Sequence, residues 1–187
     1  MILPIVAYGD PVLKKKAEPI DKDHPELQTL IENMWETMYK ASGVGLAAPQ
    51  VGKSIRLFLI DATPFAEEEE ALKDFKKVFI NAQILEESGK EWLFNEGCLS
   101  FPDLREDIYR KPVIRIRYQD EHFNEHEETY SGLVARIIQH EYDHIEGVLM
   151  VDHISPLKRQ LIKRKLNNII KGEVRHDYPM RFPQRKR

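Results

Sequence analysis

Two histidines and a glutamate form the residue pattern with the clearest chemistry in this sequence. Residues 139–144 contain the spacing His-Glu-x-x-His. On a helix, residues four apart lie one turn apart on the same face, so the imidazoles of His140 and His144 could share one cation. The carboxylate of Glu141 would lie beside that cation and could take a proton from a water molecule without being a ligand. This spacing is typical of metal-assisted hydrolysis.

A charged, solvated helix face is the simpler alternative, because so short a pattern also arises by chance. The flanking residues favour a buried helix instead. Apolar residues surround the pattern at helical spacing: Leu133, Val134, Ile137, Ile138 and Ile145. A charged triplet on a buried helix needs partners, and a metal ion supplies them. The helix is expected to begin at a Ser131 cap and to end at Gly147.

The single cysteine, Cys98, is the candidate third ligand. A lone thiol in a small protein is usually a buried apolar filler, but the two histidines make coordination the stronger interpretation here. A nearby cation lowers the pKa of a thiol, so Cys98 would bind as the thiolate. Two nitrogens and one sulfur leave a fourth position for water, which is the arrangement of a catalytic site and not of a closed structural one.

Residues 43–52 form a small, apolar stretch that is rich in glycine. The stretch lacks the Lys-Ser/Thr ending of a phosphate-binding loop. From the residues alone, two interpretations stay open. Gly43 and Gly45 can form a tight turn between a helix and a strand, or they can let a ligand approach the backbone closely, with Gln50 as the side chain that donates a hydrogen bond.

The elements that must position these groups begin with a helix between Asp23 and Ser42. Asp23 followed by Glu26 is an acidic variant of the capping box, Pro25 suits a first turn and Gly43 suits the stop. The apolar residues of this segment fall at helical spacing and are expected in the core: Leu27, Leu30, Ile31, Met34, Trp35 and Met38.

Five segments in the middle of the chain predict strands. They are residues 55–60, 78–85, 91–94, 112–118 and 127–130. The second and third are expected to form a hairpin that turns at Ser88-Gly89, and the last two an antiparallel pair. The acidic segment 63–77 is expected to be a solvated loop or helix surface without chemistry.

Ser155 and Pro156 predict the start of a last helix, which ends before Gly172. Its apolar stripe is Leu157, Leu161, Ile162, Leu166, Ile169 and Ile170, and its other face is basic. Residues 1–171 are expected to form a single catalytic domain and residues 172–187 a basic, mobile tail. The expected fold class is α+β, with antiparallel sheets packed around the central helix of the His-Glu-x-x-His pattern and a C-terminal helix.

Composition narrows the classes of function. The 187 residues include 42% hydrophobic residues, with a mean hydropathy of -0.49, as in an ordinary globular protein. No apolar run approaches the roughly 20 residues that span a bilayer, and residues 1–6 do not resemble a signal peptide. We therefore expect a cytoplasmic protein without membrane contact, with an organelle whose targeting segment is absent from this sequence as the alternative. The net charge of -3 gives no general attraction to nucleic acid, and no specific DNA binding is expected.

Three motifs in this order resemble those of the peptide deformylases. They are Gly43-Val44-Gly45-Leu46-Ala47-Ala48-Pro49-Gln50, Glu96-Gly97-Cys98-Leu99-Ser100 and Gln139-His140-Glu141-Tyr142-Asp143-His144. The resemblance spans roughly residues 2 to 170, while segment 63–77 looks like an insertion. It implies an amide hydrolase that removes the formyl group from the N-terminal formyl-methionine of newly made polypeptides and releases formate.

The resemblance also implies a role for each residue of the motifs. Cys98, His140 and His144 would bind one divalent metal ion, Fe²⁺ in the first place, with Zn²⁺, Ni²⁺ or Co²⁺ as substitutes. A metal-bound water would attack the formyl carbon, with Glu141 as general base and then as general acid. The oxyanion would be held by the metal, the Gln50 side chain and the Leu99 backbone N–H.

Further residues are expected around this centre. Glu96 and Ser100 would support it, with Glu96 paired to Arg110, although an exposed ion pair of little value is an equal alternative for that pair. The methionine pocket is expected between Val44, Phe94 and Ile137, and the extended peptide is expected to lie along the backbone of Gly45 and Gly97.

Two rival functions are weaker. A zinc peptidase with this helix pattern normally takes its third ligand downstream, whereas Cys98 lies upstream and Glu146 is too close to His144. A metal-stapled binding module could dock its basic final helix on RNA or the ribosome. Ribosome docking through the basic helix and tail is also compatible with deformylation of nascent chains, although such helices are more often simply solvated.

Overall fold

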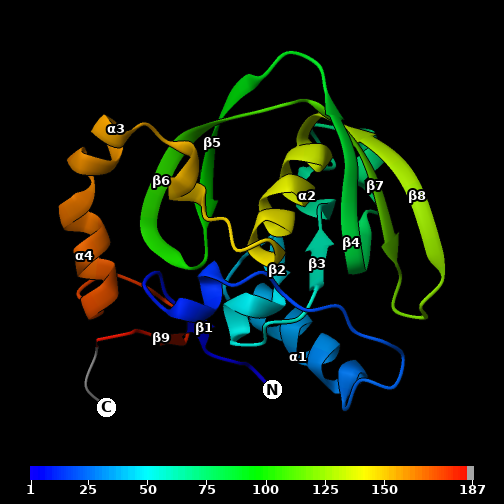
Figure 1. Cartoon of the computed structure of the whole chain (residues 1–187), viewed down its shortest axis with the longest axis horizontal. Coiled ribbons are helices and arrows are strands. Elements are labelled where there is room, and N and C mark those ends of the chain that lie inside the picture. The colour runs from blue at the N-terminus through cyan, green and yellow to red at the C-terminus, as the bar shows by residue number, and fades with distance from the viewer. Residues whose placement is uncertain (185–187) are drawn as a thin grey trace.

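Helix α2 (Gly132–Ile145) runs through the middle of the molecule, with strands on both sides of it (Figure 1). The computed structural model describes residues 1–184. Its largest sheet is antiparallel and has the order β2-β3-β4-β7-β8, namely Gly45–Ala47, Leu57–Asp61, Lys76–Ser88, Val113–Gln119 and Glu125–Ser131. A separate hairpin is formed by β5 (Trp92–Cys98) and β6 (Phe101–Arg110). The predicted α+β fold around the central helix is confirmed.

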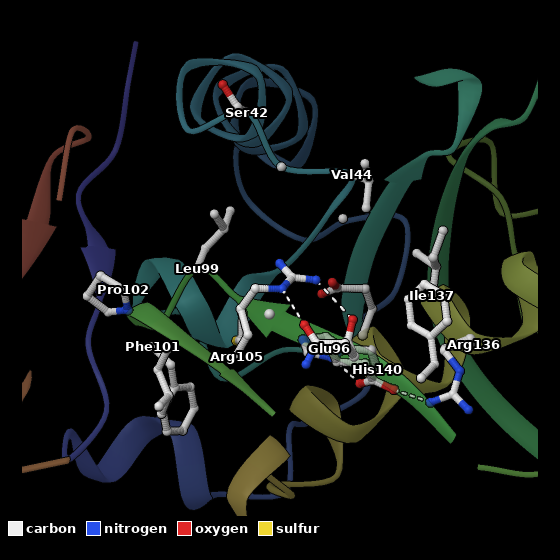
Figure 2. Close-up of a pocket in the computed structure, with 18 of the residues that line it drawn as sticks. Ser42, Val44, Glu96, Leu99, Phe101, Pro102, Arg105, Arg136, Ile137 and His140 are labelled. Carbon is white, nitrogen blue, oxygen red and sulfur yellow. Dashed lines mark hydrogen bonds and ion pairs between the residues drawn. The ribbon is translucent and has the colours of Figure 1, made fainter. Parts of the chain in front are cut away.

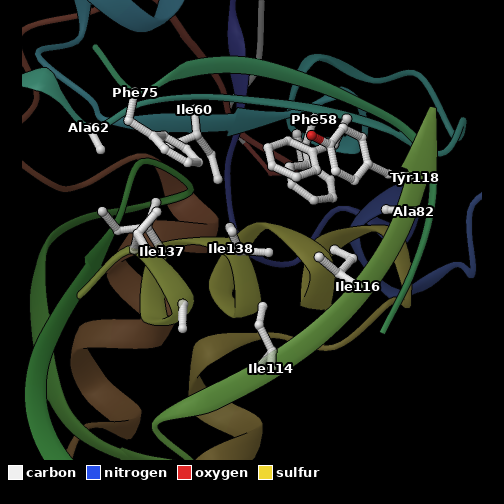
Figure 3. Close-up of a cluster of buried hydrophobic side chains, with 14 of the residues drawn as sticks. Phe58, Ile60, Ala62, Phe75, Ala82, Ile114, Ile116, Tyr118, Ile137 and Ile138 are labelled. Carbon is white, nitrogen blue, oxygen red and sulfur yellow. The ribbon is translucent and has the colours of Figure 1, made fainter. Parts of the chain in front are cut away.

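The core forms where α2 packs against the five-stranded sheet (Figure 3). Ile114 and Ile116 alternate with exposed or half-buried residues along β7, so that one face of the strand is apolar, as its sequence predicts. Ile137 and Ile138 meet this face from the helix. Burial of each such side chain stabilises the fold by about 1.5–3 kcal/mol, which fixes the position of the helix and of the site residues that it carries.

Strands β4 and β5 do not form the predicted hairpin. Ser88 at the end of β4 pairs with Val113, whereas Trp92 at the start of β5 pairs with Arg110. The chain does turn at Gly89, which has the left-handed φ of 92° that glycine favours. It thereby passes from one sheet into another, because turn residues show where a strand ends but not which strand becomes its neighbour.

Helix α1 (Leu27–Lys40) begins four residues later than the predicted cap at Asp23. The residue before a proline is disfavoured in helical conformation, so Pro25 excludes the helix from His24. Glu26 then adopts a left-handed φ of 55° at the helix entrance. The apolar stripe is in register, with Met34 and Met38 fully buried as expected.

The last helix is broken into α3 (Pro156–Leu161) and α4 (Lys163–Lys171) at Ile162. Ser155 caps α3 as predicted, accepting a 3.1 Å hydrogen bond from the N–H of Lys158. The break separates the expected apolar stripe into two parts. Ile162, Leu166 and Ile169 are buried, whereas Leu157 and Leu161 are 72% and 74% exposed. Among the helices of residues 1–184, none is long and apolar enough to cross a bilayer.

Residues 178–182 lie against the domain, whereas a mobile tail was predicted for residues 172–187. Strand β9 (Met180–Arg181) pairs in parallel with β1 (Ile5–Val6), so that the red C-terminal segment lies beside the blue N-terminal one in Figure 1. Phe182 is buried in the apolar cluster beneath β6 and α4. Apolar side chains within the basic tail thus anchor residues 178–182 to the domain. Residues 185–187 of the predicted tail lie outside the described residues.

The acidic segment between β3 and β4 is also not merely solvated. It contains two short 3-10 turns, Thr63–Phe65 and Glu70–Leu72, and buries Leu72 and Phe75. Glu69 accepts a 3.3 Å hydrogen bond from the N–H of Leu133 in the first turn of α2. Ser131 is the N-cap residue of α2, as predicted, but makes no side-chain cap bond. A carboxylate at a helix N-terminus is stabilising, so this segment supports the central helix.

Candidate metal centre

Cys98, His140 and His144 lie together at one end of the cavity beside α2. Their ligand atoms are all within 4.8 Å of one another, and the Cys98 Sγ is 3.4 Å from the His144 Nε2. The helix places the two histidines one turn apart, while the end of β5 supplies the cysteine. One thiolate and two imidazoles suit a divalent transition metal, so this cluster could hold a metal ion with the predicted set of three ligands.

The surroundings of these groups fit a cation. Burial alone would raise the pKa of the Cys98 thiol, but the two neighbouring imidazoles reverse that effect and lower the pKa to about 5. The thiolate form required of a ligand is therefore favoured. Burial raises the pKa of Glu141 to about 6 against the opposing influence of the histidines. The Glu141 Oε2 is buried without a hydrogen-bond partner among the described residues, as expected of a group that acts on a bound molecule.

Glu96 orients the first histidine. Its carboxylate lies 3.0 Å from the His140 Nδ1, which leaves the Nε2 of that ring free for the metal. It also accepts hydrogen bonds of 2.8 and 3.1 Å from Arg110. A further bond of 2.5 Å comes from Arg136, which Figure 2 shows beside Glu96 and His140. Burial alone would raise the pKa of Glu96, yet the bonds from His140 and Arg110 hold it well below its usual range. Glu96 is 5% exposed and Arg110 is 6% exposed, so the alternative of an exposed ion pair is wrong.

Two residues of this network were not predicted. Arg136 is 2% exposed, and its guanidinium also donates to the Ile108 and Trp92 carbonyl groups. Asp143 accepts a 2.8 Å bond from Arg110 and lies 2.8 Å from a ring nitrogen of His153. Arg136 precedes His140 by four residues and interrupts the apolar run 133–138, and this spacing was an available signal.

Gln50 and Ser100 line the other side of the cysteine. The Gln50 side-chain nitrogen donates to the Ser100 Oγ at 3.1 Å and lies 3.6 Å from the Cys98 Sγ. Its oxygen accepts a 3.0 Å bond from the Ala47 N–H, which fixes the amide orientation with the nitrogen toward the site. Leu99 and Ser100 form the turn between β5 and β6. The structure therefore brings together Gln50, Leu99 and the candidate ligands.

A cavity of about 560 Å³ opens in front of this cluster. All five predicted substrate-binding residues line it, namely Val44, Gly45, Phe94, Gly97 and Ile137 (Figure 2). Phe65, Arg105 and Tyr178 also line it and were not predicted. Phe65 comes from the acidic segment and Tyr178 from the tail, two regions in which no chemistry was expected.

The glycine-rich stretch connects α1 to β2, as the first of its two interpretations predicts, and its glycines also permit close contacts with other side chains. A Cβ built on Gly45 would lie 2.5 Å from the Glu141 Oε1. A Cβ on Gly43 would lie 2.8 Å from a methyl group of Leu99. Real Cβ atoms do not approach so closely, so glycine at both positions is what permits strand β2 to pack against the candidate catalytic groups.

Comparisons with known proteins agree with this arrangement. The family model of polypeptide deformylase matches residues 2–160. A peptide deformylase of Christiangramia forsetii is 62% identical, with 100% of this chain and 99% of the relative covered. One of Flavobacterium psychrophilum is 60% identical, with full coverage of both chains. The crystal structure of a peptide deformylase from Legionella pneumophila is 39% identical, with a TM-score of 0.80, over 92% of this chain and 98% of that one. From the cluster of ligands, the cavity and these matches, we conclude that this chain belongs to the polypeptide deformylase family.

Proposed function

We propose that this chain removes the formyl group from the N-terminal formyl-methionine of new polypeptides, with Glu141 moving the proton. Membership of the family supports the reaction itself. The observation that carries the roles of the residues is the unpartnered Glu141 Oε2, buried beside the Cys98, His140 and His144 cluster. That placement suits a group that activates water next to a cation.

Cys98, His140 and His144 would hold one divalent ion, and we propose Fe²⁺ as the ion used in the cell. A bound ion would act as a Lewis acid that polarises the formyl oxygen and lowers the pKa of water. Two contacts within the chain favour binding of this ion. Glu96 fixes the tautomer of His140, and the imidazoles favour the thiolate of Cys98.

Glu141 would take a proton from the attacking water and give it to the leaving amine. Its pKa of about 6 leaves it largely ionised at neutral pH and yet able to carry a proton between the two partners. The backbone of Gly45 confines the carboxylate on one side. Such confinement limits the orientations that the base can adopt while it transfers the proton.

Gln50 and Leu99 would bind the oxygen that becomes negative when the formyl carbon is attacked. The Gln50 amide nitrogen, from the 3-10 helix Ala48–Val51, and the Leu99 backbone N–H, from the turn between β5 and β6, are neutral donors. Donors that are oriented before the reaction need no reorganisation as the charge develops. In this role the Gln50 amide nitrogen would donate its hydrogen bond to the substrate oxygen instead of to the Ser100 hydroxyl.

Val44, Phe94 and Ile137 would hold the methionine side chain, since they are among the apolar residues that line the cavity beside the cluster. The peptide beyond methionine would lie extended along the backbone of β2 and β5, bound mainly by main-chain hydrogen bonds. Broad tolerance of the second and third residues is expected. A collapse of kcat/KM when these residues are varied would contradict this part of the proposal.

We further propose a cytoplasmic enzyme that docks on the ribosome through the basic face of α4. Lys163, Arg164 and Lys165 are exposed side by side on this helix. Their attraction to RNA phosphate would weaken with salt. Replacement of all three by glutamate should abolish salt-dependent ribosome binding while kcat on free peptides is unchanged. Equal ribosome binding by this variant and the wild type would show that the basic face of α4 is only solvated and does not dock.

The decisive experiment measures formate release from formyl-Met-Ala-Ser by iron-loaded, anaerobically purified protein. The matched variant is Glu141→Gln, which keeps the shape of the side chain and should lower kcat by about 10²–10⁴ while metal content is unchanged. Acetyl-Met-Ala-Ser, which carries one additional methyl group, controls for general amide hydrolysis. No formate from metal-loaded wild type would refute the function, and full activity of Glu141→Gln would refute the role of Glu141.

A further inference from the structure

Tyr178 reaches the active-site turn from a segment beyond the family match. The family model ends at residue 160, whereas Tyr178 lies between α4 and β9. Its hydroxyl donates a 2.7 Å hydrogen bond to the carbonyl of Leu99. The half-buried ring also lines the cavity, beside the apolar cluster that includes Leu99. The C-terminal segment thus contacts the residue whose backbone N–H we assign to the oxyanion.

The position of this hydroxyl is fixed by the backbone. The Ile5 N–H donates to the Pro179 carbonyl at 2.9 Å, directly after Tyr178, and the Ala7 N–H donates to the Arg181 carbonyl at 2.9 Å. Phe182, the residue after Arg181, is buried and anchors the end of this segment. These hydrogen bonds hold the chain directly after Tyr178. Substrate binding therefore does not have to order this residue.

The turn that Tyr178 contacts is short. Cys98 pairs with Phe101, so only Leu99 and Ser100 connect the two strands. Ser100 is fixed through its carbonyl, which accepts a 2.9 Å bond from the Tyr8 N–H, and through its hydroxyl, which Gln50 contacts. In a two-residue turn the peptide between the central residues can rotate and convert one turn type into another. A donor on the Leu99 carbonyl selects one orientation of that peptide. The Leu99 N–H belongs to the preceding peptide, which meets this one at the Leu99 Cα, so fixing the carbonyl also limits the rotation open to the N–H.

We propose that Tyr178 is a positioning residue of the hydrolytic site, whose hydroxyl holds the Leu99 backbone so that the Leu99 N–H stays directed at the developing oxyanion. The inference rests on the proposed function. A phenol has an ordinary pKa of about 10, so the hydroxyl is a donor at neutral pH. Phe101 and Pro102 line the same wall but lack a group that could replace it.

The test replaces Tyr178 by phenylalanine, which keeps the ring and removes only the hydroxyl. We expect kcat to fall by about tenfold and KM to stay within about twofold. A tenfold loss lies between the small effect of one neutral hydrogen bond and the roughly 100-fold effect of removing an oxyanion donor outright. In metal-free protein, the ¹H–¹⁵N resonance of Leu99 should shift or broaden, and this readout does not depend on catalysis.

The matched control is Tyr118→Phe. The Tyr118 hydroxyl likewise makes one hydrogen bond, 3.1 Å to Glu128, and this residue is remote from the cavity lining. The control should lose similar stability while kcat and the Leu99 resonance are unchanged. Unchanged kcat in Tyr178→Phe, a rise in KM alone, or equal losses in both variants would each overturn the inference. If wild-type protein releases no formate, the proposed function fails. The resonance measurement remains valid in that case, and an unchanged Leu99 resonance in Tyr178→Phe would refute the role of Tyr178 in holding the Leu99 backbone.

Discussion

Replacement of Glu96 by glutamine tests the buried charge network behind His140. The glutamate carboxylate accepts hydrogen bonds from Arg110 and Arg136 and contacts the His140 Nδ1 at 3.0 Å. Glutamine has nearly the same size, but one of its two polar atoms is a donor. That NH₂ group would face guanidinium donors, so at least one hydrogen bond would be lost together with the negative charge.

The magnitude follows from the balance of charge in the network. In wild type the buried carboxylate of Glu96 and the half-buried carboxylate of Asp143 face two guanidinium groups, Arg110 and Arg136. The variant leaves one carboxylate for two cations. Breaking a buried pair by removing one partner costs about 3–5 kcal/mol. At roughly 2–4 °C per kcal/mol for a domain of this size, Tm should fall by about 6–20 °C.

Urea unfolding of the metal-free protein at pH 7 measures the effect, with Glu127→Gln as the control. Glu127 pairs with Arg115 on the surface at 3.5 Å, and its removal should cost less than about 1 kcal/mol. The double variant Glu96→Gln/Arg136→Met restores one cation to one carboxylate. It should be more stable than the sum of its single changes by about 1–3 kcal/mol. Additive losses, or a loss no greater than that of Glu127→Gln, would refute the reasoning.

Three further changes probe other parts of the structure. Gly45→Ala would place a Cβ 2.5 Å from the Glu141 Oε1, so kcat for formate release should fall by about 10–100-fold with little change in KM. Glu69→Gln removes the carboxylate that accepts from the Leu133 N–H, and urea unfolding should show a loss of about 0.5–1 kcal/mol. Burial would raise the pKa of Asp61, but hydrogen bonds from neighbouring hydroxyl groups lower it below its usual range. A depressed carboxylate stabilises the fold above its unfolded pKa of about 3.9, so the stability gap between wild type and Asp61→Asn should shrink as pH falls from about 5 to 2.

Each of these expectations has an outcome that contradicts it. Unchanged kcat in Gly45→Ala would mean that the Glu141 carboxylate has room to move without loss of function. Glu67→Gln, an exposed change in the same acidic segment, is the control for Glu69→Gln. An equal loss in both would assign the effect to net charge and not to the helix N-terminus. A stability gap for Asp61→Asn that is constant over the pH range would show that its pKa is not lowered by folding.

The motifs allowed most of the site to be predicted from the sequence, because each motif is short and carries its own geometry. Helical spacing alone brings His140 and His144 together, and alternation in residues 113–119 identifies β7 and its buried face. Pairing between distant segments could not be predicted in this way. The turn at Gly89 was found, but the neighbours of β4 and β5 depend on which apolar faces meet in three dimensions.

Two of the residues that were missed, Arg136 and Tyr178, share a physical cause. Arg136 and Tyr178 act through hydrogen bonds to Glu96 and to the Leu99 carbonyl, and their partners lie 40 and 79 positions away in the chain. Composition described the segment of Tyr178 as basic and therefore mobile. The segment nevertheless packs on the domain, because burial of Phe182 and two strand hydrogen bonds outweigh the solvation of the charges around them.

The pairing of Ile5 with Met180 has a consequence for the order of folding. Closing a loop of about 175 residues costs about 2.5 kcal/mol more in entropy than closing one of ten residues. Contacts of such sequence separation form late, after local helices and hairpins have reduced the effective loop. During folding the metal ligands can therefore assemble before the segment of Tyr178 has docked beside β1. Hydrolytic competence would be acquired in two stages, with the Leu99 turn ordered only when the two distant strands have met.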